Sequence, residues 1–497
     1  MKIGFSNEKY LKEQKEYIME RVSKFQKLYL EFGGKLFNDR HAARVLPGYD
    51  ENIKTKLLEE LKDRSEVIIA IRAADIESNK LNNNSGTTYE RESLRLIDQL
   101  REKGISINSV VINRYYPQEN VDHFIALLNA RGIRTYTHGD TLGYPNDVDT
   151  ILSEEGFGKH SYIETTKPIV VVTAPGPGSG KMSTCLSQLY HENKRGVKAG
   201  YAKFETFPVW NLPLKHEVNL AYEAATADLN DVNQIDPYHL EAYNKVAVNY
   251  NRDVESFIIL KRILDRIMGS DIYRSPTDMG VNRITYGITD EEIVKEAAKQ
   301  EIIRRFLVAQ YEYKKIQQDD SELERLRRLM DELMLKPEDR KSVKVAREKR
   351  DELIAQGFLD RNVTAIESED GAIITGKDSL LMDSCAAAVL NMLKHLSGLP
   401  DELHMIDPAV LNPILDMKKD IEQDAKTQLN LEEVLICLAT SKLYNPSAKI
   451  CIDHLMKLRG LRGHTTGILP SIDYELLRKL NLDMTSDYED GSGKVFQ

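Results

Sequence analysis

Short apolar runs alternate with amphipathic stretches through the first 205 residues. The apolar runs have the length and β-branched content of buried strands. They cover residues 27–32, 66–72, 106–113, 133–137, 168–173 and 200–204. Between them, the pattern predicts helices over residues 89–103, 120–130 and 182–193. Strands that alternate with helices predict a mostly parallel sheet covered on both faces, with ligands bound outside the carboxyl ends of the strands.

The pattern changes near residue 290. Residues 290–350 are rich in Glu, Lys, Arg and Leu and predict long amphipathic helices. Beyond residue 361, a strand and turn at 371–377 precede predicted helices at 380–396, 409–428 and 431–443. We therefore expect an α/β protein with a P-loop-like strand–turn–helix, a helical middle segment and an α+β C-terminal domain. The predicted segments are 1–165 (N-terminal α/β portion), 166–290 (P-loop-like core), 291–360 (helical segment) and 361–497 (C-terminal domain).

A glycine-rich turn follows the strand at 168–173 and leads directly into a predicted helix. Its candidate phosphate-binding residues are Gly176, Gly178, Ser179, Gly180, Lys181, Ser183 and Thr184. In such a turn, backbone N–H groups and a helix N-terminus hold an anion, which the lysine neutralises. The match is incomplete, because Pro175 replaces the first glycine and Met182 replaces the hydroxyl residue after the lysine. The alternative is a tight structural turn.

A second set of polar residues, rich in Asn, Asp, His and Tyr, follows the strand at 200–204. The candidate catalytic residues are Lys203, Glu205, His216, Asp228, Arg252 and Asp253. Glu205 or Asp228 could act as a general base or bind Mg²⁺, and Arg252 could hold a phosphate with two parallel hydrogen bonds. Each residue could alternatively cap a helix or stabilise a turn.

Weaker signals lie elsewhere in the chain. Gly33 and Gly34 precede Lys35 at the end of the first strand, where backbone and lysine could approach an anion, although an ordinary turn fits equally well. Asp75 follows the second strand and could be a metal-side carboxylate. Residues 463–466 predict a polar turn, in which His464 could donate to a ligand or carry protons; a hydrogen-bonded structural histidine is the favoured alternative.

Composition narrows the possible partners. The 497 residues carry a net charge of −10, which disfavours a nucleic-acid partner because such proteins need a basic surface. Four cysteines without paired spacing indicate neither a disulfide framework nor a zinc site and fit the cytoplasm. The sequence shows no signal peptide and no membrane-spanning segment. We expect a small phosphate-bearing ligand and a homo-oligomer.

The blocks EFGGKLFNDRHAARVLPG, VVVTAPGPGSGKMSTCLSQLYHE and GYAKFETFP carry a resemblance to a known family. The chain resembles a bacterial family of proteins of similar length that is described only as a domain of unknown function. This resemblance covers nearly the whole chain and implies no reaction. Locally, residues 173–184 are similar to the loop of formate–tetrahydrofolate ligases, which implies ATP-dependent ligation or phosphoryl transfer, although Met182 departs from that loop at the metal-binding hydroxyl.

The sequence therefore predicts an enzyme that uses ATP, with Mg²⁺ as a possible cofactor, for phosphoryl transfer or ligation on a small polar metabolite. The predicted metal ligands stay unassigned. One alternative is a metal-independent enzyme that acts on a phosphorylated metabolite. Another is a non-catalytic nucleotide or metabolite sensor, in which the helices of 290–350 transmit binding to a partner.

Overall fold

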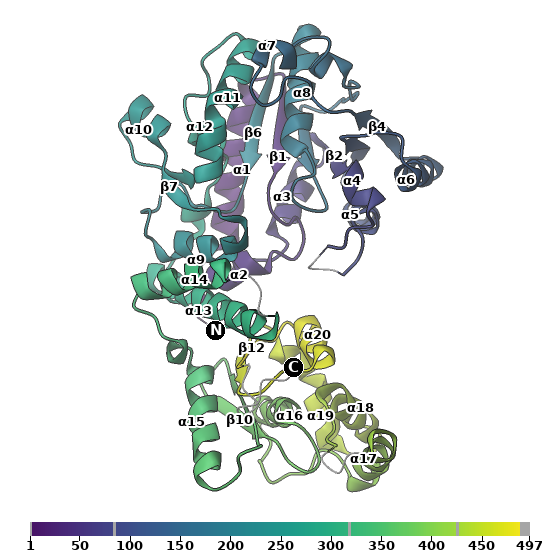
Figure 1. The fold of residues 1–497 in the computed structure, drawn as a ribbon, viewed down its shortest axis with the longest axis vertical. Helices are drawn as coiled ribbons and strands as arrows, with labels where there is room; N and C mark the ends of the chain where they lie inside the picture. The colour runs from purple at the N-terminus through teal and green to yellow at the C-terminus, as the bar shows by residue number, and fades with distance from the viewer. Residues whose placement is uncertain (1, 83–85, 317–319, 424–426, 488–497) are drawn as a thin grey trace. The chain divides into compact units, whose positions relative to one another are not determined.

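The computed structural model describes residues 2–82, 86–316, 320–423 and 427–487, and the chain divides into two compact units, residues 2–298 and 299–497. This division is coarser than the four predicted segments, which stay a prediction. Figure 1 labels the elements of both units.

The N-terminal unit is built on a six-stranded sheet in which every strand runs parallel to its neighbours, in the order β4-β3-β2-β5-β1-β6. Its strands are β1 (Lys27–Phe32), β2 (Ser65–Arg72), β3 (Ile107–Asn113), β4 (Arg134–His138), β5 (Ile169–Thr173) and β6 (Ala199–Phe204). The sequence predicted all six to within a few residues. The predicted α/β class with a parallel sheet is confirmed.

Helices cover both faces of this sheet. Tyr29, Val170 and Tyr201 alternate with Leu28 and Val171 along the strands, and all are buried, as a sheet covered on two sides requires. One face packs on α7 (Val148–Ile151), η1 (Phe157–Lys159), α8 (Lys181–Lys194) and α11 (Asn251–Met268). The connections between strands carry α2 (Arg40–Val45), α3 (Ile53–Leu61), α4 (Ala73–Glu77), α5 (Tyr89–Glu102) and α6 (Glu119–Ala130), and α1 (Asn7–Ser23) precedes β1.

The connection from β6 to α11 contains a small two-stranded arm. Its elements are α9 (Glu217–Ala225), η2 (Ala227–Leu229), β7 (Asn233–Ile235), α10 (Pro237–Tyr243) and β8 (Val248–Tyr250). After α11 come α12 (Pro276–Met279) and η3 (Ile284–Gly287).

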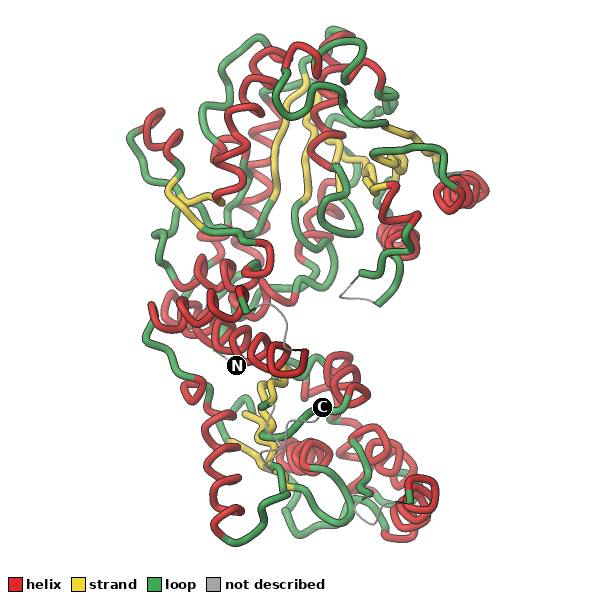
Figure 2. Tube along the Cα trace, in the orientation of Figure 1, coloured by secondary structure: helices red, strands yellow, loops and turns green. Residues whose placement is uncertain are grey.

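The C-terminal unit contains a four-stranded mixed sheet, β10-β9-β11-β12, accompanied by helices (Figure 2). The chain runs through α13 (Glu291–Ile316, which begins in the first unit), α14 (Ser321–Glu332), η4 (Pro337–Asp339), α15 (Lys341–Ala355), β9 (Val363–Glu367), β10 (Ile373–Lys377) and α16 (Ser384–Leu396). It continues through α17 (Pro408–Glu422), α18 (Leu431–Ser441), α19 (Pro446–Asp453), η5 (Leu455–Leu458), β11 (Arg462–Thr465), α20 (Ser471–Leu480) and β12 (Asp483–Ser486).

Three predictions for this unit need correction. The predicted turn at 463–466 is wrong, because Gly463, His464 and Thr465 form strand β11 between β9 and β12. The helix predicted at 380–396 begins only at Ser384, since the side chain of Asp383 accepts a hydrogen bond from Ala386 N and caps it. The helix predicted at 409–428 ends at Glu422, where Gln423 turns to a φ of 54°; its predicted residues 424–426 lie outside the described residues.

Candidate functional site

The glycine loop, residues 174–180, connects β5 to the N-terminus of α8. Gly178 and Gly180 have φ values of 71° and 86°, a region that glycine enters at little cost. Gly180 is the N-cap residue of α8 and Lys181 its first residue, so free backbone N–H groups of the helix end stand at the loop. The Ser179 hydroxyl donates to the Gly176 carbonyl at 2.7 Å and closes the turn internally.

Asn113, at the end of β3, holds this loop from the side. Its Nδ2 donates to the Ser179 carbonyl at 2.9 Å and to the Thr184 hydroxyl at 3.1 Å. Thr184 is fully buried, and its hydroxyl donates to the Gly180 carbonyl at 3.0 Å, so it supports the loop from beneath. Sequence reasoning missed Asn113, because its contact joins the end of β3 to the loop after β5, a strand that is not its neighbour.

Tyr89, the first residue of α5, packs against Gly176 of the loop. A Cβ atom on Gly176 would lie 2.5 Å from the Tyr89 ring, which explains why only glycine fits there. Asn82 adds a hydrogen bond from Nδ2 to the Pro175 carbonyl at 3.0 Å. The loop is therefore held by contacts from Asn113 of β3 and from Asn82 and Tyr89 around the start of α5. Pro177 and Gly178, at the tip of the loop, are exposed.

A carboxylate–lysine cluster, which we define as Glu31, Lys203, Glu205 and Asp253, gathers at the carboxyl ends of β1 and β6. Lys203 Nζ lies 2.7 Å from Asp253 Oδ2 and 3.1 Å from Glu205 Oε1. Asp253 belongs to the first turn of α11, so the helix places it opposite the end of β6. Glu31 accepts a hydrogen bond of 2.6 Å from the Tyr201 hydroxyl. Glu31 was not among the predicted site residues.

Burial and mutual charge shift the ionisation of this cluster. Burial raises the pKa of Glu205 to about 7, even though the Lys203 ammonium acts in the opposite direction. Burial alone would lower the pKa of Lys203, but Asp253, Glu205 and Glu31 hold it above its ordinary value. Near neutral pH, Glu205 is therefore poised to take or release a proton, and Lys203 stays charged.

Arg252 and Asp231 form a second pair beside this cluster, with Arg252 Nη2 2.7 Å from Asp231 Oδ2. Burial raises the pKa of Asp231, and Arg252 partly offsets that effect. The Arg252 side chain is 63% exposed, so it remains accessible to a ligand. Asp228 is exposed and acts on Asp231 only through its charge.

The glycine loop and the cluster share one edge of the sheet, because β5, β1 and β6 are neighbours and run parallel. The chain leaves β2 toward β3 and leaves β5 toward β6, so these two connections diverge between the neighbouring strands β2 and β5. Such a switch point is where open parallel sheets bind their ligands. The Cys185 thiol is influenced by both groups: burial raises its pKa, the Glu31 charge raises it further, and the Lys181 charge lowers it.

The remaining predicted residues lie apart from these two groups. His216 caps α9: its Nδ1 accepts from Val218 N at 3.1 Å, and its Nε2 pairs with Glu291 at 2.7 Å. Lys35 is exposed just after β1. Asp75 is buried and pairs with Lys80 at 3.2 Å. Beneath Gly33, the buried Lys54 pairs with Asp39 at 2.9 Å, an ion pair that sequence reasoning missed.

The described residues hold no group of three or more His, Cys, Asp or Glu side chains arranged to bind a metal ion. Within the same residues, no helix has both the length and the apolar character needed to cross a membrane.

Comparison with known proteins places the whole chain in one family. The model of the N-terminal domain of unknown function DUF1846 matches residues 3–334, and that of its C-terminal domain matches residues 338–496. The chain belongs to the DUF1846 family. The predicted family membership is confirmed.

Relatives of this family share the full length of the chain. A UPF0371 protein of Clostridium botulinum (strain Alaska E43) is 56% identical over 492 residues, which is 98% of each chain. A UPF0371 protein of Fusobacterium nucleatum is 55% identical over 495 residues, again 98% of each chain. Their names state no activity, so the function of a DUF1846 protein must be argued from the site itself.

Proposed function

We propose that this protein is an enzyme that binds ATP through the glycine loop and transfers a phosphoryl group to, or ligates, a small polar metabolite. The observation that carries the proposal is that the glycine loop stands at the switch point between β2 and β5 and shares the carboxyl edge of the sheet with the carboxylate–lysine cluster at the ends of β1 and β6. A phosphate-binding element and ionisable groups then stand on the same edge, as phosphoryl transfer requires.

Lys181 and the backbone N–H groups at the start of α8 would bind the phosphates. Among the described residues Lys181 forms no ion pair, so its ammonium group is available to a ligand. A lysine and oriented amides stabilise the negative charge that develops on the transferred group. Arg252, from the first turn of α11, would add charge on the acceptor side.

Glu205 would act as the general base toward the acceptor. Its carboxylate lies against Gly33, whose missing Cβ leaves the room: a Cβ there would be 2.8 Å from Glu205 Oε1. Lys203 holds the carboxylate at 3.1 Å and fixes its direction. A base with a pKa of about 7 exchanges protons efficiently near neutral pH.

Mg²⁺ fits this site only together with the nucleotide. Among the described pairs, carboxylates outnumber cations at this site. The carboxylates are Glu31, Glu205, Asp231 and Asp253, and the cations are Lys203 and Arg252. Mg²⁺ commonly takes one or two carboxylates plus phosphate oxygens, and Glu31 would supply a carboxylate while Glu205 stays the base. When bound, the ion would neutralise charge on the phosphates.

A metal-independent enzyme for a phosphorylated metabolite is the second candidate, and one observation favours it. The loop lacks a free hydroxyl at the usual metal-binding position: Met182 occupies it, and the Thr184 hydroxyl is committed to the Gly180 carbonyl at 3.0 Å. A phosphate held without a metal needs no such hydroxyl.

The proposal includes a cytoplasmic homo-oligomer. The four cysteines are free and buried, as expected in a reducing compartment. Size-exclusion chromatography with light scattering measures the oligomeric state, and a monomeric mass would contradict that part.

Thermal-shift titration with ATP, ADP, phosphate and sugar phosphates, each with and without Mg²⁺, tests the two candidates. A ligand at about 100 times its Kd stabilises a protein by about 2.7 kcal/mol. Mg²⁺-dependent stabilisation by ATP supports the first candidate, and metal-independent stabilisation by sugar phosphates supports the second.

Lys181→Ala should abolish these shifts, whereas Lys245→Ala, a change at an exposed lysine of the arm, should leave them intact. If Lys181→Ala binds every phosphate ligand as tightly as the wild type, the glycine loop is not the phosphate site.

A further inference from the structure

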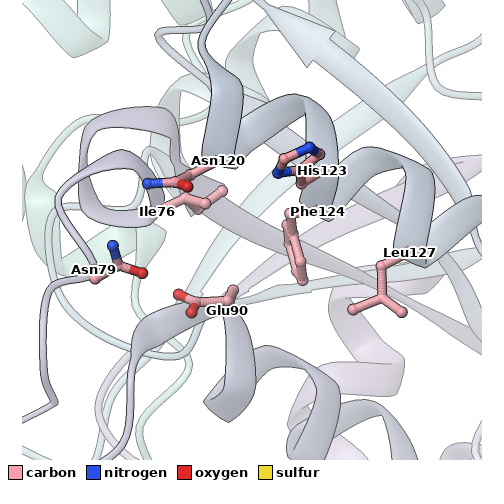
Figure 3. A pocket seen from close by; sticks show the side chains of 7 residues that line it. All are labelled: Ile76, Asn79, Glu90, Asn120, His123, Phe124 and Leu127. Atoms are coloured by element: carbon pink, nitrogen blue, oxygen red, sulfur yellow. The ribbon is translucent and has the colours of Figure 1, made fainter.

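A cavity of about 200 Å³ lies between α4, α5 and α6, on the side of the sheet away from the carboxylate–lysine cluster. Its lining residues are Ile76, Asn79, Glu90, Asn120, His123, Phe124 and Leu127. Figure 3 shows Asn79 and the Glu90 carboxylate on one side of this space and the apolar side chains of Phe124 and Leu127 on the other. An apolar wall facing a few polar groups is the usual composition of a small-molecule site.

Glu90 has an unused acceptor at this cavity. Its Oε1 accepts a hydrogen bond from the Thr88 hydroxyl at 2.5 Å. Its Oε2 is buried and has no hydrogen-bond partner among the described residues. A buried carboxylate oxygen without a partner is rare in folded proteins, so the arrangement calls for a donor from outside the chain.

The cavity is connected to the glycine loop through the start of α5. Tyr89, whose ring packs on Gly176, directly precedes Glu90. The cavity lies beside helices that follow β2 and β3, and β3 is two strands from β5, or about 10 Å at the usual strand spacing. The ribose of a nucleotide whose phosphates lie on the loop can bridge that separation.

We propose that this cavity binds the nucleobase of the nucleotide and selects a base with an exocyclic amine. The inference rests on the proposed function, because the phosphates must occupy the glycine loop. The amine would donate to Glu90 Oε2, and the flat ring would lie against Phe124 and Leu127. The carboxylate–lysine cluster then lies on the other side of the loop, where the terminal phosphate reacts.

Calorimetric titration of the full chain with ATP, ITP and inorganic tripolyphosphate tests this inference. Hypoxanthine has the shape of adenine but lacks the exocyclic amine, and tripolyphosphate lacks the base. We expect ATP to bind about tenfold more tightly than ITP, because a site built to accept a hydrogen bond discriminates against a ligand that lacks the donor. Tripolyphosphate, which lacks the whole base, should bind more weakly than ITP.

Two variants locate the effect in the cavity. Glu90→Gln should remove most of the preference for ATP over ITP, because the amide can donate to the hypoxanthine oxygen. Leu127→Trp should fill the cavity and weaken the binding of ATP about tenfold or more, while the affinity for tripolyphosphate stays unchanged. Leu240→Trp is the matched control, because Leu240 is also helical and has an exposed fraction of 41%, against 45% for Leu127.

The outcomes separate the two proposals. If Lys181→Ala weakens all three ligands but they bind the wild type equally, the loop binds phosphate and the nucleobase inference is wrong. An unchanged ATP affinity in Leu127→Trp also overturns it. If none of the three ligands binds, or if Lys181→Ala changes nothing, the proposed function fails first, and the cavity assignment fails with it.

Discussion

Each of the two units contains partly or fully buried carboxylates, but in opposite electrostatic settings. In the N-terminal unit, Asp253 faces the Lys203 ammonium at 2.7 Å, and both side chains are 17% exposed. In the C-terminal unit, Asp383 is hydrogen-bonded to Asp473, another carboxyl group. Burial raises the pKa of Asp383 to about 7, and the Asp473 charge raises it further.

The hydrogen-bond partners show what each setting does. Asp383 caps α16 through Ala386 N at 2.7 Å, and Asp473 accepts from Leu431 N, at the start of α18, at 3.2 Å. Asp473 is fully buried in the first turn of α20, so this pair joins the N-terminal ends of α16, α18 and α20. The carboxylate–lysine cluster instead stands at the carboxyl edge of the parallel sheet, beside the glycine loop. Exposure and partners, rather than residue type, distinguish a candidate site from a structural device.

The largest expected effect comes from Asp253→Asn. This change removes the carboxylate nearest to the Lys203 ammonium and should destabilise the N-terminal unit by about 3 kcal/mol, because an uncompensated buried charge is costly. Urea unfolding followed by the fluorescence of Trp210, the single tryptophan of the chain, reports on this unit.

Asp271→Asn is the control for that experiment. Asp271 pairs with Lys261 at the surface, and the Asp271 side chain is 62% exposed. The urea midpoint of Asp271→Asn should therefore equal that of the wild type. Equal midpoints for Asp253→Asn and the wild type would mean that Glu205 and Glu31 neutralise Lys203 without Asp253.

Asp383→Asn should have the opposite effect on stability and stabilise the C-terminal unit. The folded-state pKa of Asp383, about 7, lies above its ordinary value of 3.8, so the folded protein retains a proton that the unfolded chain releases. Stability from this group is present below pH 4 and is lost as the pH rises through 7. Asparagine keeps the cap without the charge and should stabilise the unit by about 2 kcal/mol at pH 8 and by almost nothing at pH 4.

Hydrogen exchange followed by mass spectrometry, on peptides from α16 of the full chain, measures this effect within the C-terminal unit. Asp370→Asn, at a largely exposed aspartate of the same unit, is the control. Slower exchange in Asp383→Asn at pH 8 but not at pH 4 is expected once intrinsic rates are corrected. Faster exchange at pH 8 would show that the charged pair stabilises the helix ends.

The sheet was predictable from sequence because its strands are continuous apolar runs such as Val170–Val172, which only a doubly covered parallel sheet buries. Strand β11 was not, because Gly463, His464 and Thr465 are small or polar and lie in a sheet through tertiary contacts. The His464 side chain is buried, with Nδ1 2.9 Å from the Thr485 hydroxyl. Its structural role was expected, but not its strand.

The candidate site was predictable in part. Glycine spacing identified the loop, and a polar run after β6 identified Lys203, Glu205 and Asp253. Strand order, which no local pattern encodes, decides that β1 lies between β5 and β6 and brings Glu31 to the same edge. Asn113 was missed for the same reason, because its contact with Ser179 joins strands that are not neighbours.

The smallest expected effect is that of Arg252→Ala. This change would make Asp231 resemble Asp383, because each would then be a partly or fully buried carboxyl group without a paired cation. Arg252 is 63% exposed, so its loss should cost less than about 1 kcal/mol. It would, however, leave Asp231 buried without its cation, and the pKa of that carboxyl, already raised by burial, should rise further.

Stability from a carboxyl group with a raised pKa is lost as the pH increases, so the cost of Arg252→Ala should be smaller at pH 5 than at pH 8. Trp210 fluorescence during urea unfolding at both pH values measures it. Arg266→Ala, whose partner Asp149 is 80% exposed, should show no such difference between the two pH values. An equal loss for Arg252→Ala at pH 5 and pH 8 would mean that Arg252 stabilises the unit by packing rather than by charge, and would remove the electrostatic reason for assigning it to the acceptor side.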